Sequence, residues 1–149
     1  MVHVHPTAPD ARPTTVDQIV EQFLDGALDP DSWTHPAHLF VCRHVLATSM
    51  GPAEALDRLR PLIQAHNRRV GLRPGHGAYH ETVTRYFVEA MAHANPPSIA
   101  AVLVEPSLRR DAPSAHWSAA VLASPAAQER WVAPDLRPLP WPTSIATPT

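Results

Sequence analysis

The chain contains a single cysteine, no lysine and no long apolar run, and each shortage excludes a class of protein. One cysteine rules out a disulfide within the chain and indicates a reducing compartment. No apolar run approaches the roughly 18 residues that a membrane span requires. The N-terminus also lacks the basic and then apolar pattern of a signal peptide. We therefore expect a cytoplasmic protein with no membrane partner.

Charge and motifs argue against several other classes. The formal net charge is −2 and the arginines are scattered, so no nucleic-acid partner is expected. The chain has no Gly-x-Ser-x-Gly sequence and no glycine-rich phosphate loop, which disfavours serine-nucleophile and phosphate-binding chemistry. It also lacks the Glu-x-x-His pairs of carboxylate-bridged di-iron proteins. Abundant alanine, proline and arginine favour a GC-rich bacterial origin.

What the sequence does contain is the pattern of one helical domain. Its 149 residues suit one core, and apolar residues recur at helical spacing. Thr15 and Gln18 predict a capping box at the first helix, and Thr34 predicts the N-cap of the second. Pro52 begins the third helix, inside which Pro61 predicts a kink or break.

The fourth main helix is expected from about residue 79 to residue 93. Beyond it the pattern weakens, and three short helices are expected at 99–104, 118–123 and 125–132. The proline-rich stretch 135–142 holds apolar side chains, which suggests an extended segment laid over the helices. The predicted fold is therefore an all-α, single-domain helical bundle with a Pro-rich C-terminal segment packed across it.

The domain boundaries are predicted from proline content and the lack of periodicity. A flexible N-terminal arm is expected at residues 1–13, the single helical domain at 14–142, and a disordered tail at 143–149. The glycine-containing loop 72–78 is expected to be mobile and to lie near any site at that end of the bundle.

Histidines are concentrated in the middle of the chain. Seven of the ten lie between Trp33 and Asn95, and three of these belong to two compact motifs. In the first motif, His35 and His38 are three residues apart on one helical face, a spacing that lets both imidazoles reach one metal ion. The alternative is that His35 hydrogen-bonds in the first turn while His38 is a satisfied core histidine.

The second motif, His80-Glu81, opens the fourth helix. His80 shares a stripe with Phe87 and Met91, so it is expected to point inward. Adjacent helical residues diverge by about 100°, so Glu81 is interpreted as an acid/base group or a partner of a ligand rather than as a ligand. The alternative is that Glu81 only complements the helix dipole.

The remaining candidates are left open or given structural roles. His66, His76 and His116 are undecided, because each joins a site only if its segment folds over the end of the bundle. Cys42 falls on the apolar side of its helix, which favours a buried structural thiol over a nucleophile.

Two longer motifs resemble those of a family of small bacterial helical proteins. They read Trp-Thr-His-x-Ala-His-Leu from Trp33 and Tyr-His-Glu-Thr-x-Thr-Arg from Tyr79. The resemblance extends over roughly residues 19–140. It implies no particular activity, but it implies that four residues act as a unit: His35, His38, His80 and Glu81. Departures from the family pattern at 61, 66 and 76 favour a specialised member, such as one serving a biosynthetic pathway.

These observations lead to three functional hypotheses. The first is a metal-dependent enzyme acting on a small-molecule substrate, in which His35, His38 and His80 bind one divalent zinc, copper, iron or nickel ion. Glu81 then orients a ligand or moves a proton, and hydrolytic, lyase and oxidative chemistry all remain open. The second is a metal-free binding protein or acid/base enzyme with a histidine-lined pocket. The third is a structural or interaction protein with satisfied core histidines. The sequence leaves the oligomeric state open.

Overall fold

The computed structural model describes residues 12–72, 78–142 and 145, and all regular structure within them is helical. The elements in chain order are α1 (Val16–Leu24), η1 (Pro30–Ser32), α2 (His35–Ala47), α3 (Pro52–Arg69), α4 (Glu81–Ala94), α5 (Ile99–Val104), η2 (Pro106–Leu108), η3 (Ala112–Ala115), α6 (Ala119–Leu122) and α7 (Pro125–Glu129). The η elements are short 3-10 helices. The all-α class is confirmed.

The predicted N-caps of the first two helices are confirmed, with one adjustment in the first capping box. The Thr15 hydroxyl accepts a hydrogen bond from the Gln18 backbone N–H at 3.1 Å, as expected. The Gln18 side chain reaches back one residue further than predicted, because its Oε1 accepts from the Thr14 N–H at 2.7 Å. In α2, the Thr34 hydroxyl caps the Ala37 N–H at 3.3 Å.

Of the kink or break predicted at Pro61, a break does not occur, because α3 continues through this residue. A proline inside a helix removes one i to i−4 hydrogen bond, here the one to the Asp57 carbonyl. Both residues are exposed, so water is able to satisfy that carbonyl. The unbroken helix has a consequence for the site, since it places Arg60 and Asn67 on one continuous face.

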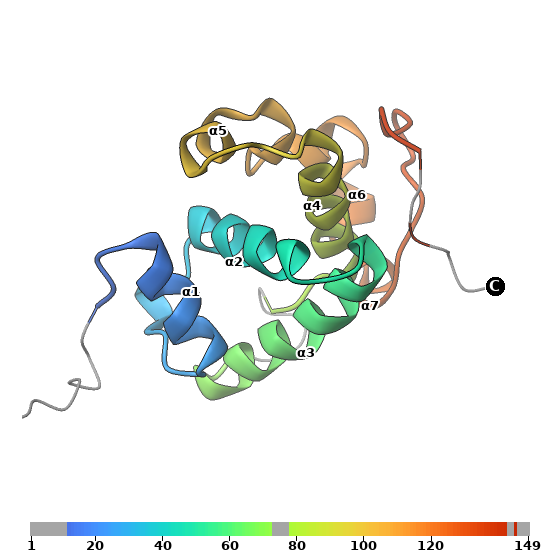
Figure 1. Ribbon diagram of the computed structural model, residues 1–149. Coiled ribbons are helices and arrows are strands. Elements are labelled where there is room, and N and C mark those ends of the chain that lie inside the picture. The colour runs from blue at the N-terminus through green and yellow to red at the C-terminus, as the bar shows by residue number, and fades with distance from the viewer. Residues whose placement is uncertain (1–11, 73–77, 143–144, 146–149) are drawn as a thin grey trace, which may run out of the picture.

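The central helix α2 crosses the middle of α4 instead of running beside it (Figure 1). The His35 ring lies 5.1 Å from the Phe87 ring, and the Cys42 thiol lies 3.9 Å from the Phe87 carbonyl. The first residue of α2 and a residue near its middle thus both contact Phe87 of α4. Six of the 13 residues of α2 are buried, which makes it the core helix that the sequence predicts.

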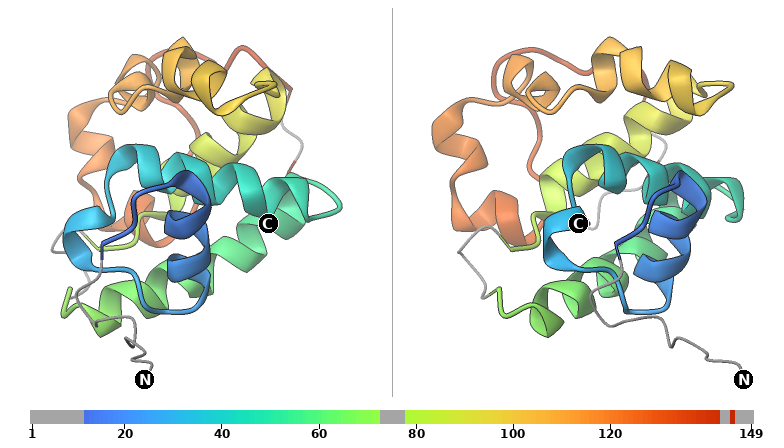
Figure 2. Two further views of the ribbon diagram at one scale, coloured as in Figure 1. Left: turned by 60° about the vertical axis from the view of Figure 1, so that its left-hand side comes forward. Right: turned by 90° about the vertical axis from the view of Figure 1, so that its left-hand side faces the viewer.

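The C-terminal third folds back onto α4, and α6 and α7 lie on the opposite side of the molecule from α1 (Figure 2, right). The expected short helices are found, although α7 ends earlier than predicted. Trp141 is buried, and so is Ile145, which falls in the stretch expected to be a disordered tail. The other residues of 143–149, most of the arm 1–13 and loop residues 73–77 lie outside the described residues. No helix among the described residues is long and apolar enough to cross a membrane.

Candidate functional site

The structure makes His80 the N-cap of α4. Its Nδ1 accepts a hydrogen bond from the Val83 N–H at 3.2 Å, so the proton of the neutral ring is on Nε2, which donates to the Leu122 carbonyl at 2.7 Å. Both ring nitrogens are therefore used by the backbone. The helix begins at Glu81, one or two residues later than predicted, because the imidazole replaces the usual Ser, Thr or Asp cap.

A first prediction follows from this capping role. His80→Ala removes the cap and leaves the Leu122 carbonyl without its donor, so the free energy of unfolding is expected to fall by about 2 kcal/mol. His80→Asn retains a capping oxygen, and about half of the loss is expected to be restored. Urea unfolding measures both. Equal stability of wild type and His80→Ala would contradict the capping role.

His35 is separated from His80 by the crossing of α2 and α4. Its Nε2 donates to the Leu108 carbonyl at 2.8 Å, and its ring packs against Phe87. Phe87 is seven residues beyond His80, which is about 10 Å of helix rise. His35 and His80 thus lie at different levels of α4 and each is held by a backbone carbonyl.

His38 belongs to an aromatic cluster with Phe23, Trp33 and His66. The indole of Trp33 stacks on Phe23 at 4.2 Å between ring centroids and lies 3.8 Å from the His38 ring. Buried His66 lies 5.3 Å from Trp33, and the Arg69 guanidinium donates to its Nδ1 at 3.2 Å. This donation requires the neutral His66 tautomer with its proton on Nε2. Burial, and then the charge of Arg69, lower the pKa of His66.

His38 combines accessible surface with a strongly lowered pKa. The residue is exposed, and the Trp33 indole packs against its ring at 3.8 Å between centroids. Desolvation is the largest cause and the charges of His35, His66 and Arg110 add to it, and together they lower the pKa of His38 to about 3. The imidazole is therefore neutral at physiological pH.

A second prediction concerns the titration of this ring. NMR of the ring nitrogens is expected to show His38 still neutral at pH 5, whereas the unfolded chain titrates near 6.5. Because the folded pKa is the lower one, acid favours the unfolded state. The contribution of His38 to stability is present above pH 6.5 and is lost as the pH falls toward 3. A His38 midpoint near 6.5 in the folded protein would refute this assignment.

Glu81 is paired with Arg60 and Tyr79. Its carboxylate accepts from Arg60 Nε at 2.8 Å and Nη2 at 2.9 Å, and from the Tyr79 hydroxyl at 2.5 Å. Burial opposes ionisation of Glu81, but the hydrogen bonds from Arg60 and Tyr79 and the Arg60 charge outweigh it and lower its pKa. Burial and the same carboxylate raise the pKa of Tyr79. We expect Glu81 to be ionised and Tyr79 protonated at neutral pH.

This network forms one wall of a cleft of about 700 Å³ between α3, the start of α4, and α7. We call it the α3–α7 cleft. It is lined by Arg60, Gln64, Asn67, Arg68, Leu72, Ala78, Tyr79, Glu81, Pro125, Gln128 and Glu129. The lining thus includes three side-chain amides, two arginines and two glutamates. Asn67 is only 6% exposed and lines the cleft from α3.

The α3 part of this cleft lies outside the residues that the sequence predicts to form a site. Arg60, Gln64 and Asn67 recur at intervals of four and three residues, which is a polar stripe on one helical face. That spacing was a usable signal. It was obscured by Pro61, because an expected break at that residue separates Arg60 from the other two.

The residues predicted to share a metal ion are not brought together. Among residues 12–72 and 78–142, no group of three or more His, Cys, Asp or Glu side chains is placed to hold an ion. To bind an ion through Nε2, His80 would have to break its bond to the Leu122 carbonyl and move its proton to Nδ1, which ends the cap. His35 would have to break its bond to the Leu108 carbonyl. Cys42 is buried, as predicted, and burial raises the pKa of its thiol to about 12.

The chain matches no known protein family, and comparisons with curated proteins and with solved structures find no match. The resemblance carried by the two histidine motifs therefore stays a prediction.

Proposed function

We propose that this protein binds a small polar organic molecule in the α3–α7 cleft and needs no metal ion to do so. The observation that carries the proposal is the cleft itself. Its volume of about 700 Å³ falls within the range of about 300–1,000 Å³ typical of small-molecule sites. Its Arg60–Glu81–Tyr79 wall is held by three short hydrogen bonds, which pre-organises the site.

The lining favours a ligand of low net charge that carries both donors and acceptors. The charges of Arg60 and Arg68 are balanced by those of Glu81 and Glu129. The amides of Gln64, Asn67 and Gln128 each offer a donor and an acceptor.

Binding is favoured over proton transfer because of the pKa shifts. An efficient general acid or base has a pKa near the working pH. The pKa of Glu81 is lowered and that of Tyr79 is raised, so both move away from neutrality. His38, with a pKa of about 3, is likewise a weak base. In the cleft, Glu81 and Tyr79 are therefore better suited to hydrogen-bonding a ligand than to exchanging protons with it.

The metal-dependent enzyme remains a prediction. One experiment distinguishes it from metal-free binding in the cleft. Thermal unfolding is followed with panels of polyols, nucleosides and amino acids, in buffer that contains EDTA. A cleft ligand at a hundredfold excess over its Kd is expected to stabilise the protein by about 2.7 kcal/mol. Gln64→Ala is expected to reduce this stabilisation, whereas Gln18→Ala, on α1 and outside the cleft, leaves it unchanged.

Two outcomes would overturn the proposal. One is stabilisation that Gln64→Ala does not reduce, since the ligand would then bind elsewhere. The other is about one divalent ion per chain in the purified protein, absent from both His38→Ala and His80→Ala, together with ligand binding that EDTA abolishes. That result would support an ion shared by the histidines.

A further inference from the structure

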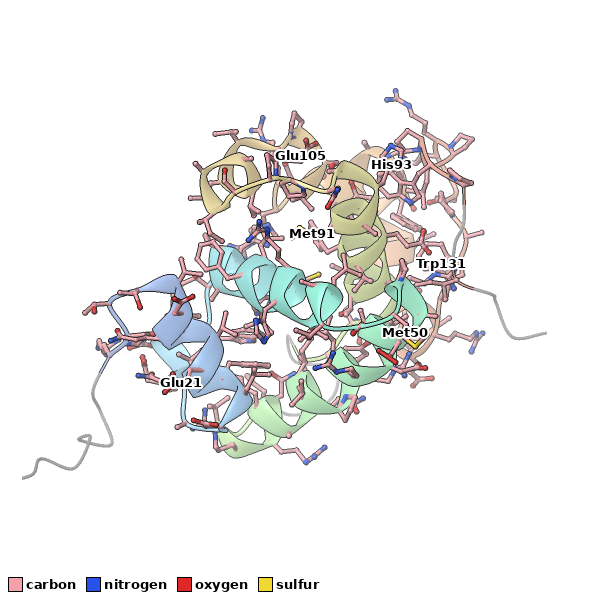
Figure 3. All side chains as sticks on the ribbon, viewed as in Figure 1. Glu21, Met50, Met91, His93, Glu105 and Trp131 are labelled. Carbon is pink, nitrogen blue, oxygen red and sulfur yellow. The ribbon has the colours of Figure 1, made fainter. Side chains whose placement is uncertain are left out.

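A second concave surface lies away from the α3–α7 cleft, between α1, α2 and the corner where α4 meets α5. It has a volume of about 860 Å³ and we call it the α1–α2 groove. Its α1 wall is built from two parallel stripes, each repeating every four residues. The apolar stripe is Val16, Val20 and Leu24, and the acidic stripe is Asp17, Glu21 and Asp25. Figure 3 labels Glu21 in this wall, and Met91 of α4, which also lines the groove.

The rest of the groove is mainly apolar. Phe40, Leu46 and Ala47 come from α2, and Ile99 begins α5. Leu24, Leu46 and Ile99 are only partly buried, so they still present apolar surface to solvent. An apolar strip of this kind beside a charged edge fits the apolar face of an amphipathic helix.

The charge of the groove indicates the charge that a partner must carry. Within the described residues, none of the three α1 carboxylates forms an ion pair. The opposite wall offers a single guanidinium, Arg43, which already donates to the Pro96 carbonyl at 3.3 Å. Three carboxylates against one guanidinium leave the groove with an excess of negative charge. A cationic partner gains attraction here and an anionic one is repelled.

The spacing of the carboxylates selects the shape of the partner. Residues four apart in a helix are separated by about 6 Å along the axis, so Asp17 and Asp25 are about 12 Å apart. A helix lying along α1 repeats its own side chains at the same interval. We propose that the α1–α2 groove docks an amphipathic helix of a partner protein whose apolar face is flanked by a row of basic residues.

The probe for this proposal is a synthetic amphipathic peptide of leucine and lysine, labelled for fluorescence anisotropy against the full chain. A peptide with glutamate in place of lysine tests charge, and a scrambled peptide of equal composition tests the helical pattern. The leucine–lysine peptide is expected to bind best, and its affinity is expected to fall as salt is raised.

Two charge reversals locate the binding site. Glu21→Lys is expected to lower the affinity for the leucine–lysine peptide by about tenfold or more, because it places like charges opposite each other. Asp111→Lys changes the net charge equally but lies outside both the groove and the α3–α7 cleft, and is expected to change the affinity little. Glu21 and Asp111 are both exposed, so both variants are expected to fold.

The proposal is overturned if both reversals weaken binding equally, or if the scrambled peptide binds as well as the patterned one. It is also overturned if sedimentation shows a dimer that Glu21→Lys dissociates, because a second copy would then occupy the groove. None of these results bears on the α3–α7 cleft, so failure here leaves the proposed function intact.

Discussion

Replacing Arg85 with methionine is expected to lower the free energy of unfolding by about 3–5 kcal/mol, because it leaves a buried carboxylate without its counter-charge. Arg85 and Glu89, both 2% exposed, are joined by a 2.9 Å ion pair along α4. The guanidinium also donates to the Ile145 carbonyl at 2.8 Å and lies 4.1 Å from the centre of the Trp131 ring. One side chain thus connects α4 to two C-terminal segments, and removing it disrupts all of these contacts.

Chemical denaturation measures this loss, and two further variants make it interpretable. Arg12→Met removes an exposed arginine that pairs with Asp29 and Asp31, and it is expected to cost no more than about 1 kcal/mol. The double variant Arg85→Met/Glu89→Leu removes both buried charges and is expected to recover part of the stability. The recovery is incomplete because the Trp141 indole N–H loses its acceptor, Glu89 Oε1, 3.0 Å away. A loss below about 1 kcal/mol for Arg85→Met alone would show that water reaches Glu89 in the folded protein.

Local chemistry made much of this fold predictable. Thr15 and Thr34 cap helices because their hydroxyls satisfy N–H groups within three residues, and such contacts are encoded within one helical turn. Gly26 and Gly71 follow α1 and α3 with positive φ, as expected of residues that end helices. Cys42 is buried because it lies on an apolar face. Each of these features is determined by residues close to it in the sequence, and so it can be predicted from the sequence.

The candidate site was less predictable, because it depends on how helices cross. Side-chain periodicity places His35 and His80 on faces of their own helices, but it contains no information on the angle between α2 and α4. The structure sets His35 against Phe87, two turns beyond His80. The capping role of His80 was equally hidden, since its Nε2 partner, Leu122, is 42 residues away. Long-range partners of this kind are decided by packing.

Replacing Glu81 with glutamine is expected to have the largest effect on the α3–α7 cleft. The carboxylate accepts three hydrogen bonds, two of them from Arg60, and an amide cannot reproduce that pairing because it brings its own N–H groups. Hydrogen bonds to charged groups contribute about 1.5–3 kcal/mol. Since the Arg60 side chain is 34% exposed, water offsets part of this, and we expect a loss of about 2 kcal/mol at pH 7.

The pH dependence of this loss distinguishes the ion pair from a mere change in packing. The pKa of Glu81 in the folded protein is below its ordinary value of 4.5, so the unfolded chain takes up the proton first as the pH falls. The stabilisation by Glu81 is therefore complete above pH 4.5 and is lost below it, through the lowered pKa of the folded state. Urea unfolding of wild type and Glu81→Gln is expected to show two curves that converge in acid. Tyr79→Phe, which removes one hydrogen bond and no charge, is expected to cost less at pH 7. A gap between wild type and Glu81→Gln that stayed constant from pH 7 to pH 3 would mean that shape rather than charge holds the wall of the cleft, and a ligand would then have no fixed guanidinium–carboxylate pair to recognise.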